Sequence, residues 1–178
     1  MRPAVFFDRD GVINESPGEG YVLTPEALRL RPGAAEAVAE ARAAGRLTVL
    51  VTNQRCVEIG LLAEDRLQAI HDKMQSDLRA TAGATLDSIY ACTADDDGHP
   101  ERKPNPGMAL RAAAELGIDL AASWMIGDQD KDIEFARAAG LAGVIRVDSG
   151  KPKRLTADVE LADMRGAARV LRGLLLGR

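Results

Sequence analysis

Short apolar runs alternate with segments of helical periodicity along most of this chain. The apolar runs are bounded by glycine and polar residues, which is typical of buried strands. The predicted strands are Ala4–Asp8, Leu47–Thr52, Ser88–Cys92, Ser123–Gly127 and Gly143–Val147.

The segments between these runs predict helices. In the longest one, apolar residues recur at helical spacing: Leu67, Ile70, Met74 and Leu78. The predicted helices are Gly33–Ala44, Ala63–Ala82, Asn105–Leu116 with Asn105 as its N-cap, Asp130–Ala139, and a last helix over roughly Leu161–Leu176. Because strands and helices alternate and the strands are almost continuously apolar, the sequence predicts an α/β fold with a parallel sheet covered on both faces.

Length, charge and cysteine content narrow the class of protein. The 178 residues predict a single domain over residues 1–178. The net charge of −4 and the lack of a basic block argue against a nucleic-acid partner. No run of 18 apolar residues and no secretory leader is present, and two cysteines do not form a disulfide framework. We therefore expect a soluble, cytoplasmic, monomeric protein with no membrane partner.

Polar residue types follow the predicted strands where one site would be built. In open parallel sheets, ligands bind beyond the carboxyl ends of the strands. The segments at these ends are Asp8-Arg9-Asp10, Thr52-Asn53-Gln54, Arg102-Lys103 and Gly127-Asp128. Surface polarity alone would not supply a reactive residue type at each of these ends.

The first of these segments has the sharpest chemistry. Asp8 and Asp10 begin on the same side of a strand, and Gly11 allows a sharp turn after them. Two carboxylates this close repel one another unless a cation or proton intervenes. The pair suits a Mg²⁺ ion with an aspartate as nucleophile or acid/base, although alone it could equally be a surface turn.

Two further segments suit an anion. The Thr52 hydroxyl and nearby N–H groups could hold a phosphate oxygen, or could simply form a strand-to-loop turn. Lys103 precedes the start of a predicted helix, a favourable place for an anion, or is one of an ordinary solvated basic pair with Arg102.

The last segment suits a metal ion. Asp128 lies at a strand tip and could bind a cation directly, while Asp132, four residues on, could orient it. The alternative is an acidic helix N-terminus that needs no metal. Asp130 and Lys131 are interpreted as the solvated face of this helix.

Together these residues predict phosphoryl transfer. A phosphate dianion approaches carboxylates only if its charge is cancelled, which Lys103 and a Mg²⁺ ion held by Asp8 and Asp128 would do. We expect Asp8 to attack phosphorus and form an aspartyl-phosphate intermediate. Asp10 would protonate the leaving oxygen and then activate water.

The motifs resemble the haloacid dehalogenase (HAD) superfamily of phosphatases, from about Ala4 to Lys151. They are similar in particular to the branch that holds D-glycero-D-manno-heptose 1,7-bisphosphate phosphatases and histidinol-phosphate phosphatases. The matching segments are Phe7-Asp8-Arg9-Asp10-Gly11-Val12-Ile13-Asn14, Gly20-Tyr21-Val22, Pro32-Gly33, Thr52-Asn53-Gln54, Ile70-His71-Asp72-Lys73-Met74 and Arg102-Lys103-Pro104-Asn105-Pro106-Gly107-Met108.

The resemblance implies a Rossmann-like three-layer sandwich and a Mg²⁺-dependent phosphatase of small phosphorylated metabolites. It implies Asp8 as nucleophile and Asp10 as acid/base. The implied Mg²⁺ ligands are Asp8, the Asp10 carbonyl and Asp128. The residues implied to bind phosphate or substrate, or to lie near them, are Thr52, Asn53, Arg102, Lys103 and Lys151.

Two segments depart from the family pattern. The family usually carries a zinc loop of three cysteines and one histidine before its Arg-Lys-Pro, but here only Cys92 fits and His99 is displaced. We expect no zinc, with zinc held by Cys92, His99 and an aspartate as the alternative. In the second segment, which follows Gln54, Ile59 stands where the family has a substrate-contacting arginine, although Arg55 could reach the same phosphate.

The short segments after the first and third strands leave no room for a large cap domain. Glu15–Tyr21, which contains two glycines, is instead the expected mobile flap. The predicted reaction is hydrolysis of a heptose 1,7-bisphosphate to a monophosphate. The alternatives are a histidinol-phosphate phosphatase, a broader small-molecule phosphomonoesterase and, outside the enzymes, a phosphate-binding scaffold domain.

Overall fold

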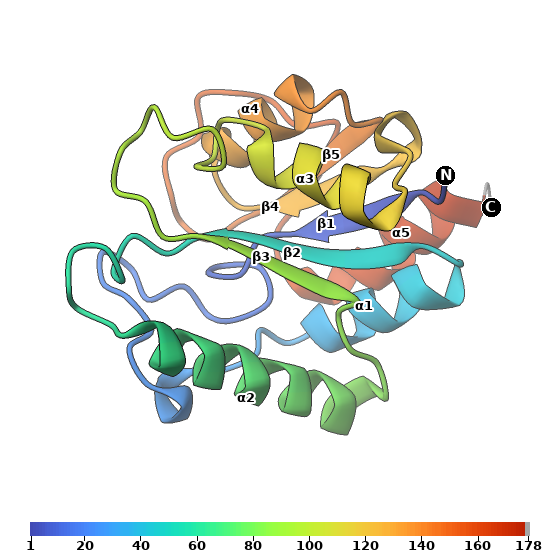
Figure 1. The fold of residues 1–178 in the computed structure, drawn as a ribbon. Coiled ribbons are helices and arrows are strands. Elements are labelled where there is room, and N and C mark those ends of the chain that lie inside the picture. Colours follow the sequence, from blue (N-terminus) through green and yellow to red (C-terminus); the bar gives the residue numbers. More distant parts are fainter. Residues whose placement is uncertain (177–178) are drawn as a thin grey trace.

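A six-stranded parallel sheet forms the centre of the computed structural model, which describes residues 1–176 (Figure 1). The strands lie in the order β3-β2-β1-β4-β5-β6, and each neighbouring pair is parallel. Their bounds are β1 Ala4–Phe7, β2 Leu47–Asn53, β3 Ser88–Cys92, β4 Trp124–Gly127, β5 Gly143–Val147 and β6 Val159–Leu161.

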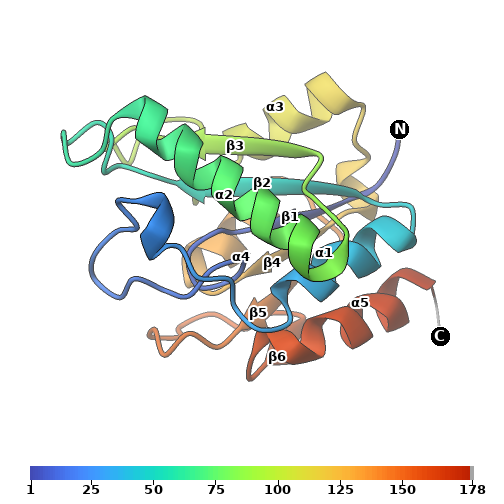
Figure 2. The same cartoon turned by 90° about the horizontal axis from the view of Figure 1, so that it is seen from below.

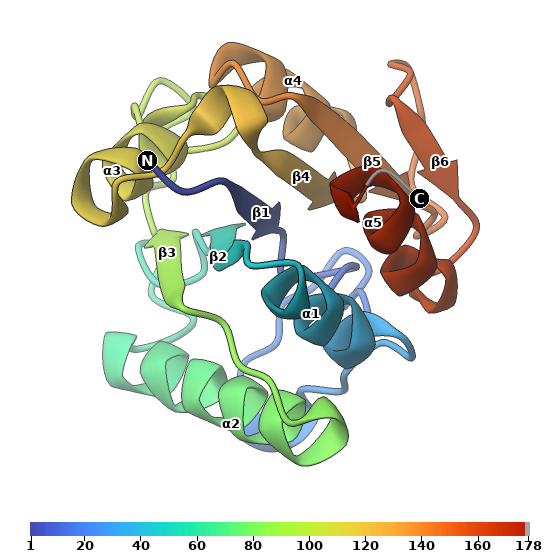
Figure 3. The same ribbon diagram turned by 90° about the vertical axis from the view of Figure 1, so that its right-hand side faces the viewer.

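Helices cover both faces of this sheet. Helices α1, α2 and α5 lie on one face and α3 and α4 on the other, as Figures 1 and 3 show from two sides. Seen from below in Figure 2, α2, α1 and α5 lie across the sheet. The helices are α1 Ala34–Ala43, α2 Glu64–Ala82, α3 Gly107–Leu116, α4 Asp130–Ala138 and α5 Ala167–Leu176, with short 3-10 helices at Pro25–Ala27, Leu120–Ala122 and Met164–Gly166. The predicted Rossmann-like three-layer sandwich is confirmed.

Strand β1 supplies side chains to both cores of the molecule. Because side chains alternate along a strand, Val5 and Phe7 pack toward α1, α2 and α5, whereas Ala4 and Phe6 pack toward α3 and α4. All four are completely buried. The apolar run at the start of the chain is thus explained by burial on two faces, and it places Asp8 at the carboxyl edge of the sheet.

The C-terminal part differs from the sequence prediction. Leu161 belongs to the additional strand β6, which pairs with β5, so the predicted helix over Leu161–Leu176 begins only at Ala167. The turn before it begins at Asp163, whose carboxylate accepts a hydrogen bond from the Arg165 N–H at 2.8 Å. Strand β6 has only three residues and none is fully buried, so it lacks the apolar run that marks the other strands.

The start of α3 also differs. Asn105 does not cap the helix, which begins at Gly107, because its side-chain amide donates to the carbonyl oxygens of Asp97 and His99 at 3.0 Å each. A Cβ atom on Gly107 would lie 2.4 Å from the carbonyl oxygen of Pro100. The loop after β3 therefore folds back on the helix start and fixes where Arg102 and Lys103 lie.

No separate cap domain interrupts residues 1–176, since every named strand belongs to the one sheet. The segments after β1 and β3 are loops, with one short 3-10 helix at Pro25–Ala27. Across the same stretch of chain, no helix is long and apolar enough to cross a membrane.

Candidate active site

The carboxyl ends of β1, β2 and β4 and the loop after β3 meet at one edge of the sheet, as the sequence predicts. The Lys103 ammonium lies 2.7 Å from Oδ1 of Asp8 and 2.7 Å from Oδ1 of Asp132. All three side chains are almost completely buried. Lys103 therefore joins the strand end at Asp8 to the first turn of α4, which holds Asp132.

Burial and nearby charge shift the proton affinity of these groups. Burial raises the pKa of Asp8 to about 6, with Asp132 and Asp128 adding to the effect against the opposing charge of Lys103. Burial disfavours the charged form of Lys103. The carboxylates of Asp132 and Asp8 outweigh this effect, and together they raise the pKa of Lys103. A further cation beside Asp8 would favour its ionised form, which is the nucleophilic form.

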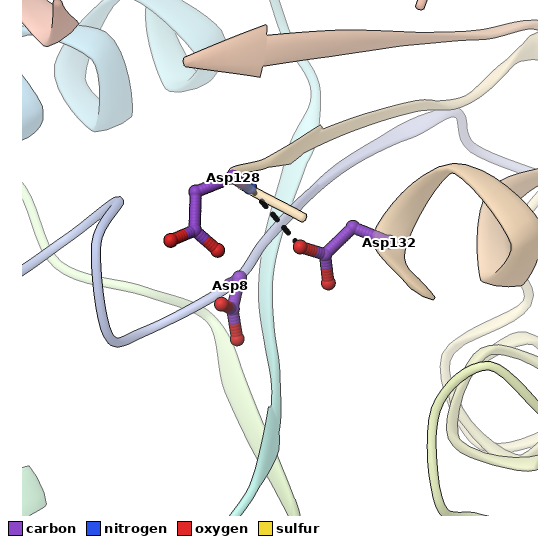
Figure 4. Close-up of side chains that lie close together, drawn as sticks. All are labelled: Asp8, Asp128 and Asp132. Carbon is purple, nitrogen blue, oxygen red and sulfur yellow. Dashed lines mark hydrogen bonds between the residues drawn. The ribbon is translucent and has the colours of Figure 1, made fainter. Parts of the chain in front are cut away.

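Asp128 completes a cluster of three carboxylates. Figure 4 shows the side chains of Asp8, Asp128 and Asp132 lying close together. Oδ2 of Asp128 accepts from the Lys151 ammonium at 2.8 Å, whereas its buried Oδ1 has no hydrogen-bond partner. Oδ2 of Asp132 accepts from the backbone N–H groups of Asp128 and Gln129 at 3.0 Å each, so Asp132 orients the loop that presents Asp128.

Two glycines permit this close approach. Gly11 has a φ of +92°, and a Cβ atom there would lie 2.3 Å from Oδ2 of Asp128. A Cβ atom on Gly127 would lie 2.3 Å from Cβ of Asp132. The chain makes the sharp turn predicted at Gly11. Glycine is required there both by the positive φ and by the Asp128 carboxylate beside it.

The cluster fits a divalent cation. One ligand atom from each of Asp8, Asp128 and Asp132 lies within 4.8 Å of the others, the only such group of three among residues 1–176. Both oxygens of Asp132 already have donors, while the orphaned Oδ1 of Asp128 is a buried acceptor that needs a partner. Asp8 and Asp128 are therefore the carboxylates best placed to hold Mg²⁺, which prefers oxygen ligands.

Asp10 lies in a different environment from Asp8. Its carboxylate accepts hydrogen bonds from the Arg9 guanidinium, from the Asn14 amide at 2.9 Å and from the Gln54 amide at 2.9 Å. Burial alone would raise the pKa of Asp10, but the Arg9 charge and the two amide donors lower it below its ordinary value. In this conformation Asp10 is ionised.

The sequence did not single out the three donors that hold Asp10. Arg9 is completely buried, which is rare for an arginine, and its Nη1 lies 3.5 Å from Nε2 of the buried His71. Asn14 follows Asp10 by four residues, and Gln54 follows Thr52 by two. Both therefore belong to segments that match the family, and this match was the signal that could have identified them.

Thr52 and Asn53, predicted to bind phosphate, lie at the end of β2. The Thr52 hydroxyl oxygen accepts from the Gln54 amide at 2.8 Å, which leaves its own proton free to be donated. The Asn53 side chain exchanges two hydrogen bonds with the backbone of Lys103, at 2.9 and 3.0 Å. Asn53 thereby fixes the position of Lys103.

The two arginines predicted near the substrate are engaged with the protein. The Arg55 guanidinium donates to the Tyr21 hydroxyl at 2.8 Å and pairs with Asp95 at 3.2 Å. The Arg102 guanidinium pairs with Asp97 at 2.8 Å and donates to the Ala94 carbonyl. Neither arginine contacts the cluster of Asp8, Asp128 and Asp132 in this structure.

A cleft of about 150 Å³ opens beside the cluster. The predicted flap Glu15–Tyr21 supplies one wall of it, through Pro17, Gly18, Gly20 and Tyr21. Its other lining residues are Asp10, Asn53, Gln129, Lys131 and Lys151.

The interpretation of Asp130 as part of a solvated helix face was wrong, whereas Lys131 is partly exposed. Asp130 pairs with Arg146 at 2.9 Å and accepts from the backbone N–H groups of Arg154 and Leu155. Lys131 lines the cleft beside Asp10. The loop after β5 folds back over this helix start, a contact that local charge pattern does not reveal.

The segment expected to lack zinc brings its two metal-ligating residue types together. Sγ of Cys92 lies 3.6 Å from Nδ1 of His99, and residues 95–98 form an exposed turn as expected. Cys92 and His99 border a cleft of about 530 Å³ that is larger than the cleft beside the Asp cluster. Size alone does not mark the reactive site, since the smaller cleft is the one that contains Asp10 and opens beside the titratable cluster.

Comparison with known sequences agrees with this geometry. The sequence model of the haloacid dehalogenase-like hydrolase family matches residues 5–137, and that of HAD-hydrolase-like proteins matches residues 101–174. A relative from Rhodopseudomonas palustris, D-glycero-beta-D-manno-heptose-1,7-bisphosphate 7-phosphatase, is 41% identical over 150 residues, covering 80% of this chain and 82% of the relative. The D-glycero-alpha-D-manno-heptose-1,7-bisphosphate 7-phosphatase of Burkholderia mallei is 36% identical, covering 81% of this chain and 79% of the relative.

Solved structures agree as well. The D,D-heptose 1,7-bisphosphate phosphatase from B. bronchiseptica, complexed with magnesium and phosphate, superposes with a TM-score of 0.84 at 32% identity and covers 95% of this chain and 97% of its own. The corresponding protein from Burkholderia thailandensis has a TM-score of 0.69 at 26% identity, with 96% and 98% covered. The chain belongs to the haloacid dehalogenase-like hydrolase family.

Proposed function

We propose that the chain is a Mg²⁺-dependent phosphatase that hydrolyses a D-glycero-D-manno-heptose 1,7-bisphosphate to the monophosphate. The observation that carries the reaction type is the buried Asp8 carboxylate, held by Lys103 and set against a second carboxylate, Asp128, with an orphaned oxygen. The substrate follows from the names of the relatives, which are 7-phosphatases of this sugar bisphosphate.

Asp8 would act as the nucleophile. Lys103 holds one of its oxygens, which leaves the other free to form a bond to phosphorus. The same ammonium, the Thr52 hydroxyl and Lys151 supply positive charge and donors for the oxygens of the transferring phosphate. Mg²⁺ at Asp8 and Asp128 would cancel the charge of the phosphate dianion beside these carboxylates.

Asp10 would act as acid and then as base. Its ionised form, favoured here by Arg9, is the one that activates water to hydrolyse the aspartyl phosphate. To protonate the leaving oxygen it must first take up a proton, and the arriving dianion raises its pKa and so favours that step. Asn14 and Gln54 keep Asp10 turned toward the cleft through both steps.

The nucleophile is tested with Asp8→Asn. The amide cannot attack phosphorus, so phosphate release from the heptose bisphosphate should fall by at least about 1,000-fold with the fold intact by circular dichroism. Asp65→Asn on the exposed part of α2 is the matched control and should retain wild-type activity. Substantial turnover by Asp8→Asn would contradict an aspartyl-phosphate mechanism.

The substrate is tested with a panel of phosphates at fixed Mg²⁺. We expect the highest kcat/KM for one of the two heptose 1,7-bisphosphate anomers, above histidinol phosphate, fructose 1,6-bisphosphate and simple monophosphates. Flat, weak turnover across the panel would instead favour a broader phosphomonoesterase, the alternative consistent with Ile59 and with an Arg55 already engaged by Tyr21 and Asp95.

A further inference from the structure

A second, basic cleft lies next to the cleft that contains Asp10. It has a volume of about 260 Å³ and is lined by Gln129, Asp130, Lys131, Lys151, Pro152 and Arg154. Three of these residues, Gln129, Lys131 and Lys151, also line the cleft that contains Asp10. The two clefts therefore adjoin one another along these residues, so a ligand bound beside Asp10 would reach the second cleft by extending past them.

The size of the first cleft makes such an extension necessary. At about 150 Å³ it is smaller than a typical small-molecule site of about 300 Å³ or more. A sugar with a phosphate at each end cannot fit within it when one phosphate lies at Asp8. Arginine side chains for the far phosphate are offered by Arg55 and Arg102 on the loops after β2 and β3, and by Arg154 on the loop after β5.

Charge distinguishes these two choices. Arg55 and Arg102 are paired with Asp95 and Asp97, so their charge is largely cancelled within the protein. On the other side, no ion pair within residues 1–176 involves the side chain of Lys131 or Arg154. Cations without an internal partner are the ones that can bind an added phosphate at little cost.

The wall that holds Arg154 is also fixed. Its backbone N–H donates to Oδ2 of Asp130 at 2.9 Å, and the next N–H, of Leu155, donates to Oδ1 at 3.1 Å. Arg146 is only 3% exposed, and its guanidinium donates hydrogen bonds to both the Asp130 carboxylate and the Leu155 carbonyl. A loop held in this way presents its cation with little ordering cost on binding.

We propose that this second cleft binds the phosphate that is not transferred, with Lys131 and Arg154 as its ligands. The inference rests on the proposed function and names the part of the same site that selects a bisphosphate over a monophosphate. It assigns that selection to the start of α4 and the loop after β5 rather than to the position of Ile59.

The test compares the heptose 1,7-bisphosphate with the heptose 7-phosphate, which share the phosphate to be released. The wild-type protein should favour the bisphosphate in kcat/KM. Arg154→Ala and Lys131→Ala should each lower that ratio at least about tenfold, because each removes a charge-assisted hydrogen bond. Lys153→Ala is the matched control, since Lys153 pairs with Asp148 and does not line the cleft, and it should leave the ratio unchanged.

A binding measurement separates recognition from chemistry. In the Asp8→Asn background, calorimetry should show weaker binding of the bisphosphate when Arg154 is replaced, and no change when Lys153 is replaced. A wild-type preference that survives both Arg154→Ala and Lys131→Ala would overturn the inference while leaving the proposed function intact. A wild-type protein without preference for the bisphosphate would overturn both.

Discussion

Arg9 is a buried arginine that joins the candidate active site to helix α2. Its guanidinium binds the Asp10 carboxylate and lies 3.5 Å from the ring of His71. Burial, with the Arg9 charge adding to it, lowers the pKa of His71 from 6.5 to about 4. His71 is therefore neutral in the folded protein at physiological pH, in agreement with a structural role.

This shift makes the stability of the protein depend on pH. Below pH 6.5 His71 is protonated in the unfolded chain, whereas in the folded chain it stays neutral down to about pH 4. The free energy of unfolding therefore falls as pH falls from 6.5 to about 4. We expect His71 to account for a loss of about 2 kcal/mol in the free energy of unfolding between pH 7.5 and pH 5. Urea unfolding of wild type and His71→Asn at both pH values measures it.

The His71→Asn variant should lose correspondingly less stability between pH 7.5 and pH 5. His99→Asn removes the only other histidine and is the matched control, expected to keep the wild-type dependence. An identical pH dependence in wild type and His71→Asn would contradict the assignment.

At this scale the sequence could predict residue types but not their partners. Asp8, Lys103 and Asp128 were predicted to come together because each follows a strand of a parallel sheet, and they do. The opposite environments of Asp8 and Asp10 were not predictable, because Lys103 is 95 residues from Asp8 and Gln54 is 44 from Asp10. Partners so distant along the chain are chosen by the fold, not by local pattern.

Among the elements, the turn after β1 is tightly constrained by its neighbours. Gly11→Ala would place a Cβ atom against the Asp128 carboxylate in a left-handed conformation. We expect a loss of about 2 kcal/mol or more in the free energy of unfolding and a large loss of activity, since Asp128 must move. Urea unfolding and phosphate release report the two effects.

Gly45→Ala is the matched control for this change. Gly45 also has a positive φ, of +72°, but nothing lies within 4 Å of a Cβ atom built there. This substitution should cost about 1 kcal/mol of stability and leave activity unchanged. Equal effects of both substitutions on activity would show that the Gly11 turn does not set the position of Asp128.

Helix α5 owes its stability to one buried face. Leu171 is completely buried among residues of α1, whereas Leu174, on the same helix, is 38% exposed. Leu171→Ala should lower the free energy of unfolding by about 2 to 5 kcal/mol and Leu174→Ala by less than about 1 kcal/mol. Similar losses for both, measured by urea unfolding, would contradict the packing of α5 on α1.

The elements that the sequence predicted share a strong local signal. Strands β1, β2, β4 and β5 are short, largely apolar runs, and α2 carries a regular apolar face, so burial pattern and sequence pattern coincide in these elements. Strand β6 is an edge strand of three residues in which Glu160 faces Arg146, so pairing with β5 rather than burial makes it a strand. Such pairing leaves no apolar periodicity to detect.

For the whole molecule, bound metal should act as a stabiliser. The carboxylates of Asp8, Asp128 and Asp132 repel one another, and a cation that binds only the folded state stabilises it by mass action. At a Mg²⁺ concentration one hundred times its Kd, we expect about 2.7 kcal/mol, or a Tm rise of roughly 5 to 10 °C. Thermal unfolding with Mg²⁺ and with a chelator measures this effect.

Asp128→Asn should abolish most of the Mg²⁺ effect, because it weakens a carboxylate ligand. Asp65→Asn, at an exposed position in the first turn of α2, should retain it. A wild-type Tm that does not change with Mg²⁺ would show that the Asp cluster does not bind the ion.

The order of the strands has a consequence for how the protein is made. Strand β1 lies in the interior of the sheet, between β2 and β4, yet it is synthesised first and β4 begins only at Trp124. At usual rates of translation this delay is on the order of ten seconds. During this delay the edge of β1 that pairs with β4 has no partner, which leaves Val5, Phe6 and Phe7 open to association with other chains. The strand that positions Asp8 is thus also a segment of the nascent chain that needs protection until the second half of the chain leaves the ribosome.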